Sequence, residues 1–161
     1  MGKQQPHASP VAVAAAAPIA VSVQAATATP AELTALACAA GTKKARSNYV
    51  RMFLMACVAG ALIGVGGMCS VSVGKGLPNA DSGLQRFAFG AVFPVGLILV
   101  VLTGAELITG NFAVLLVAWL NRRVALWEVV AAWVVVYVGN LVGSLGLAYF
   151  FAFLTDLYAA A

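Results

Sequence analysis

The feature that most constrains this chain is a polar stretch inside a long apolar run. Residues 102–111 contain one carboxylate, two threonines, two glycines and an asparagine, and they lie within the apolar residues 87–120. An ionised side chain at the bilayer centre costs about 3 kcal/mol on insertion scales, so Glu106 is expected to face protein or water. Glycine and hydroxyl residues suit a spanning helix that breaks and re-satisfies its freed backbone groups. The helix that restarts after the break would present N–H groups that favour an anion. The stretch therefore predicts a discontinuous helix lining a transport path.

The rest of the composition agrees with an all-α membrane protein. The chain is 63% hydrophobic and only 9% charged, which excludes an ordinary soluble domain. Its 161 residues accommodate about three spans of roughly 20 to 30 residues. The net charge of +4 does not indicate nucleic-acid binding, because the few basic residues border the apolar spans, where they set topology. Glu106 has no second titratable partner for acid–base chemistry, so no enzymatic activity is expected.

Two segments precede the spans. Residues 1–28 are rich in Ala, Val, Pro and Gln and contain no acidic residue, which predicts disorder or, alternatively, an organellar targeting segment. Residues 29–48 are expected to form an amphipathic helix on the membrane surface or against the bundle. Thr29 and Glu32 have the spacing of a capping box, and Gly41 suits the end of this helix.

Residues 49–158 are expected to form the transmembrane domain. The first span covers about residues 49–73, the broken second span residues 84–120, and the third residues 127–154. Small residues let helices approach closely, and this predicts packing through Gly60, Gly64, Gly139, Asn140 and Gly143. For Asn140 itself, two roles remain open: an interhelical hydrogen-bond donor or a ligand.

Basic residues predict the orientation. Residues 43–51 and 122–123 carry Lys and Arg on the same side of a three-span arrangement, so the N terminus is expected on the cytoplasmic-equivalent side. The membrane would be the plasma membrane or a plastid envelope. Cys38, Cys57 and Cys69 lack metal-ligand spacing, so they are expected to be packing residues, with no metal or other cofactor.

Residues 104–111, Gly-Ala-Glu-Leu-Ile-Thr-Gly-Asn, closely resemble the signature of the formate/nitrite transporter family at the break in its second helix. Residues 29–45, 59–67 and 137–143 are similar to other parts of that family, and the resemblance covers residues 29–158. It implies an aquaporin-like fold of six spans in two inverted repeats. It also implies homopentamers in the lipid bilayer with one pore per subunit, which pass small anions such as formate and nitrite, in several members with protons.

The resemblance also suggests roles for individual residues. It implies a pore constriction formed by Phe93, Leu97, Leu107, Ile108 and Thr109. Each of the four apolar residues is either part of a hydrophobic gate or an ordinary packing residue, and Thr109 either lines the pore or caps a helix. Glu106 and Asn111 belong to the loop of the break. Glu106 either sets the local field, for example by holding a lysine, or caps freed N–H groups and pairs with a cation.

By this resemblance the chain looks like the first of the family's two repeats. The second repeat would contain another broken helix and a central pore histidine, whereas His7 lies in the N-terminal segment. Two functions therefore remain open. The chain is either the N-terminal half of a proton-linked channel for formate or nitrite, or a truncated, non-transporting membrane subunit that associates with full-length transporters. A water or glycerol pore ranks below both, because the Asn-Pro-Ala signature is missing.

Overall fold

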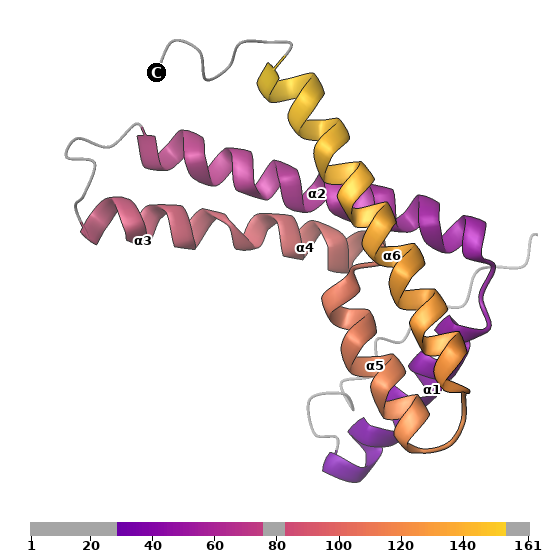
Figure 1. Cartoon of the computed structure of the whole chain (residues 1–161). Coiled ribbons are helices and arrows are strands. Elements are labelled where there is room, and N and C mark those ends of the chain that lie inside the picture. The colour runs from indigo at the N-terminus through magenta and orange to yellow at the C-terminus, as the bar shows by residue number, and fades with distance from the viewer. Residues whose placement is uncertain (1–28, 76–82, 154–161) are drawn as a thin grey trace, which may run out of the picture.

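The structure is a computed structural model, and it describes residues 29–75 and 83–153. The prediction of disorder or targeting concerns residues 1–28, which lie outside these residues. The predicted third span reaches residue 154, which also lies outside them. Within them every regular element is a helix, so the predicted all-α class is confirmed. Figure 1 shows the helices arranged around a crossing of two long helices, α2 and α6.

Three helical segments are long and apolar enough to cross a membrane, as predicted. They are α2 (Tyr49–Lys75), the continuous pair α3 (Gly83–Val92) and α4 (Pro94–Thr103), and α6 (Leu126–Leu147) with its π-helical extension η2 (Ala148–Phe153). The apolar stretches within them are Tyr49–Lys75, Gly83–Thr103 and Leu126–Phe151, with 27, 21 and 26 residues. All three reach the roughly 20 residues that about 30 Å of hydrocarbon requires. A shorter apolar helix, α5 (Ile108–Leu120), follows α4.

The predicted break within residues 84–120 is present. In the structure 21 residues precede the break and 13 follow it in α5, so α3 and α4 together are already long enough to span. They meet at Phe93, because Pro94 lacks the N–H that would continue the helical ladder. Figure 1 shows that α5 then leaves α4 at a sharp angle.

The N-terminal helix α1 (Pro30–Ala45) begins as predicted and ends later than predicted. Glu32 accepts from the backbone N–H of Thr29 at 2.7 Å, and Thr29 caps the Glu32 N–H in return. Gly41 does not end the helix, which continues to Ala45. A side chain at Gly41 would overlap the Val114 carbonyl of α5. The close approach of α1 to α5 therefore outweighs the cost of about 1 kcal/mol for glycine inside a helix.

Glycines set the crossing of α2 and α6. A Cβ at Gly60 would overlap the carbonyl of Asn140, and one at Gly143 would overlap that of Cys57. Gly139 lies against α2 in the same way, because a Cβ there would lie 2.9 Å from the Phe53 carbonyl oxygen. Gly64 differs, because its neighbour is only the flexible end of Leu147. Backbone contact at three of these positions brings the middle of α6 directly onto α2.

The core is small and sits where α1, α2, α5 and α6 meet. Its largest fully buried apolar side chains are Met52, Leu115, Val129 and Val136. In contrast, α4 approaches α2 closely at Gly66, where a Cβ would overlap the backbone of Gly96, and α3 contacts α2 through Gln85, whose side-chain amide donates to the Gly74 carbonyl at 3.0 Å. Most of the α3–α4 surface is exposed and apolar. This face needs a cover of lipid or protein.

Candidate functional site

The candidate site is the break between α4 and α5. Gly104 ends α4 with φ of 65°, in the left-handed region. A Cβ at Gly104 would meet nothing within 4 Å, so the backbone conformation and not crowding favours glycine here. Residues 105–107 then run without helical structure until α5 begins at Ile108.

The backbone groups freed by the break find partners inside the protein. The N–H of Ala105 donates to the Val100 carbonyl at 3.1 Å. The N–H of Glu106 donates to the Met55 carbonyl of α2 at 3.3 Å. Such pairing is what allows irregular backbone at membrane depth, because an unpaired group in hydrocarbon costs several kcal/mol.

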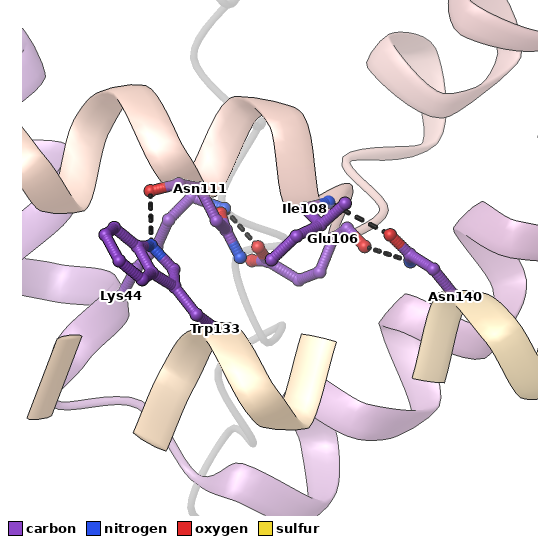
Figure 2. Close-up of polar contacts among 6 residues, drawn as sticks. All are labelled: Lys44, Glu106, Ile108, Asn111, Trp133 and Asn140. Atoms are coloured by element: carbon purple, nitrogen blue, oxygen red, sulfur yellow. Dashed lines mark hydrogen bonds and ion pairs between the residues drawn. The ribbon is translucent and has the colours of Figure 1, made fainter. Parts of the chain in front are cut away.

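Asn140 of α6 completes this pairing with one side chain (Figure 2). Its amide nitrogen donates to the Glu106 carbonyl at 2.9 Å and to the Ala56 carbonyl at 2.8 Å. Its amide oxygen accepts from the N–H of Ile108 at 3.0 Å. Asn140 therefore joins α2, α6 and both sides of the break. It is an interhelical donor, and it also caps the first N–H of α5, a role that we did not predict.

The Glu106 carboxylate forms an ion pair with Lys44 of α1 (Figure 2). The two side chains are 18% and 29% exposed, so water screens the pair only in part. The pair ties the N-terminal helix to the break. Pairing with a cation is therefore observed for Glu106, whereas the N–H at the start of α5 is bound by Asn140 instead.

A cavity of about 430 Å³ lies beside the break. Its walls include Thr103, Gly104 and Glu106 at the break, together with three cations, Lys43, Lys44 and Arg51. Three positive charges against one carboxylate leave the cavity with a positive field. A small anion would be drawn into it from solution.

The predicted constriction residues do not share one environment. Phe93 and Leu97 are 43% and 47% exposed, one turn apart on the surface that the core does not cover. Leu107 is half-buried and Thr109 is exposed at the start of α5. Ile108 packs against the core. Among the described residues, therefore, the structure brings Leu107 and Thr109 to the break and leaves Phe93 and Leu97 on an open face.

Asn111 is buried, at 1% exposure. Its backbone carbonyl accepts from the indole N–H of Trp133 at 3.3 Å (Figure 2). Trp133 also packs edge-on against Phe112, with ring centroids 4.9 Å apart. These contacts fix the first turn of α5 against α6.

Two residues of the site were not identified from the sequence. Lys44 was interpreted only as a topology charge, although Glu106 is the one acidic residue within residues 87–120 and required a partner. Trp133 lies too far inside its span to be an interfacial anchor. Its position in the sequence could therefore have indicated that its side chain binds another helix. No group of three metal-binding side chains occurs among residues 29–75 and 83–153.

The chain is similar in sequence to known proteins. The family model described as formate/nitrite transporter matches residues 31–161. A formate-nitrite transporter of Entamoeba histolytica is 43% identical over 105 residues, which are 65% of this chain and 30% of the relative. A probable formate transporter of Methanothermobacter thermautotrophicus is 38% identical over 130 residues, with 79% and 47% covered.

A formate channel of Bacillus thuringiensis is 37% identical over 128 residues, which are 80% of this chain and 49% of the relative. The chain thus spans about half, or less, of the length of these relatives. All three are described as transporters or channels and not as enzymes. The matched model covers well over half of the chain, and the chain therefore belongs to the formate/nitrite transporter family.

Proposed function

We propose that this chain supplies one half of a channel for small monovalent anions such as formate or nitrite. The observation that carries the proposal is the break between α4 and α5, which Asn140 and the Lys44–Glu106 pair hold in place. The names of its relatives, a formate channel and formate transporters, support the choice of anion.

The charges at the break suggest how an anion would be handled. Lys43 and Arg51 raise the local anion concentration in the cavity beside the break. The start of α5 adds the partial positive charge of a helix N-terminus, and Thr109 offers a hydroxyl at that end. Both effects favour a small anion over a cation.

Apolar side chains near the break would then oppose passage of the substrate in its charged form. An anion loses hydration beside Phe93, Leu97 and Leu107, and the cost of burying an unpaired charge is large. A protonated, neutral acid avoids most of that cost. We therefore propose that passage is linked to protons, with the proton donor supplied by the other half of the channel.

The exposed face of α3 and α4 would be covered by that second half and by neighbouring subunits. We propose a homopentamer of such completed units, with the N-terminal side at the cytoplasmic-equivalent surface. Lys43, Arg46 and Arg123 line one cavity at this end of the molecule, which is the charge distribution that this orientation requires.

The test supplies a second half as a separate polypeptide. The full chain is co-expressed with the C-terminal half of the Bacillus thuringiensis relative, purified as a complex and reconstituted into vesicles that contain a pH-sensitive dye. We expect formate and nitrite uptake that rises as the external pH falls. A complex that assembles and passes neither anion would refute the proposal and favour a non-transporting subunit. The same complex with Thr109→Leu is the matched variant, and its flux should fall at least about tenfold with assembly unchanged.

A further inference from the structure

We propose that the cavity between α1 and the α5–α6 turn binds the phosphate headgroup of an anionic phospholipid. This cavity has a volume of about 740 Å³ and is separate from the cavity beside the break, although Lys43 lines both. Three cations line it: Lys43 near the end of α1, Arg46 at its C-cap, and Arg123 in the turn before α6. The proposal depends on the chain being in a membrane and does not depend on transport.

The three charges have no acidic partner among the described residues. The structure describes three acidic side chains, and each is engaged elsewhere. Glu32 binds Thr29, Glu106 binds Lys44, and Glu128 accepts from the N–H of Ala125. None of them lines the cavity. Three unneutralised cations around one hollow favour a multiply hydrogen-bonding anion such as a phosphate.

Hydroxyl groups extend the binding surface. Thr34 and Thr42 both line the cavity. Each hydroxyl donates its proton to a carbonyl one turn earlier in α1, at 2.8 Å. The hydroxyl oxygens remain able to accept from the OH groups of a headgroup such as glycerol.

The turn that carries Arg123 is held in a costly conformation. Arg122 has φ of 57°, in the left-handed region where a residue other than glycine costs about 1 kcal/mol. The N–H of Arg123 then donates to the Ala118 carbonyl at 3.0 Å. This bond fixes the backbone of Arg123 at the end of α5, beside α1.

The position of the cavity favours a lipid over a soluble phosphate. The turn joins two apolar helices that end at Leu120 and begin at Leu126, so it marks the membrane surface. Trp119 and Trp127 flank it, as aromatic residues do at that level. Apolar residues of α1 also line the cavity, namely Ala31, Ala35 and Ala39. Basic pockets at the ends of membrane helices, with apolar surface alongside, suit anionic headgroups.

The experiment measures lipid binding by the full chain in detergent, using native mass spectrometry. The probes are dioleoylphosphatidylglycerol, dioleoylphosphatidylcholine and inorganic phosphate. We expect the first phosphatidylglycerol to bind at least about tenfold more tightly than phosphatidylcholine. In the double variant Arg46→Gln/Arg123→Gln that affinity should fall about thirty-fold, the effect of removing two cations near a membrane surface.

The control removes the same charge elsewhere. Arg51→Gln/Arg122→Gln lowers the net charge equally, and neither residue lines this cavity, so binding should stay within about threefold of wild type. Equal losses in both double variants would mean general surface attraction and would overturn the proposal. Inorganic phosphate that competes fully at equal concentration would indicate a soluble anion instead. Arg46→Lys/Arg123→Lys keeps both charges and should retain binding. If the Gln pair fails to fold, the single variant Arg123→Gln replaces it, with an expected loss of about fivefold.

Discussion

Asn140 should be the most sensitive side chain of the break. Asn140→Leu keeps the branch at Cγ, but three hydrogen bonds are lost. The Ala56 carbonyl lies inside α2 and keeps its helical partner, so its loss costs little. The Ile108 N–H and the Glu106 carbonyl are left without a partner, at about 1–3 kcal/mol each. We therefore expect about 2–6 kcal/mol of destabilisation, localised at the break.

Amide hydrogen exchange of the full chain in detergent measures this directly. A loss of about 2 kcal/mol or more should speed exchange at Ile108 by at least about 25-fold. The control Asn121→Leu removes a single bond from an exposed amide to the Val117 carbonyl, and exchange at Ile108 should not change. Unchanged protection of Ile108 in Asn140→Leu would refute the idea that this side chain holds the break.

Two further outcomes follow from the helix contacts and the cap. Gly60→Val should destabilise the chain by about 1–3 kcal/mol in thermal unfolding, because its side chain meets the α6 backbone. Gly67→Val, which meets nothing within 4 Å, should change stability little, and similar losses for both would contradict the crossing. Hydrogen bonds from Thr29, from its backbone first and then its side chain, lower the pKa of Glu32. The stability that these hydrogen bonds give to the start of α1 is fully present above the ordinary pKa of Glu. It disappears as the pH falls through the lowered pKa of Glu32. The first turn of α1 should then exchange faster, and Glu32→Gln should show no such pH dependence.

The sequence predicted the break well because its residues are chemically out of place. A carboxylate with glycines and threonines in an apolar run has few structural solutions. The capping box of α1 was equally predictable from the sequence, because Thr29 and Glu32 bind each other within one helical turn. Local chemistry of this kind is fully contained in the sequence.

Long-range partners were not predictable in the same way. Asn140 reaches Ile108 across 32 residues of sequence, and Lys44 reaches Glu106 across 62. Both depend on how closely the helices approach. The same limit explains the error at Gly41, where the sequence alone does not distinguish a helix end from a contact with another backbone.

The last prediction concerns the ion pair between Lys44 and Glu106. It separates the effect of the Glu106 charge from the effect of the shape of its side chain. Because the pair is only about a fifth to a third exposed, its coupling free energy should lie between that of surface and buried pairs, about 1–3 kcal/mol. A double-mutant cycle of Lys44→Gln and Glu106→Gln, followed by thermal unfolding of the full chain, measures it.

In the complex completed by a second half, Glu106→Gln should still assemble but carry less formate and nitrite, because the unpaired Lys44 would hold the anion more tightly. Glu106→Leu should abolish assembly or flux, because leucine favours one continuous helix and is cheap in lipid. Assembly is read by size exclusion and flux by uptake at several pH values. Wild-type behaviour of Glu106→Leu in both assays would mean that the charge does not maintain the break, and Asn140 alone would then have to account for it.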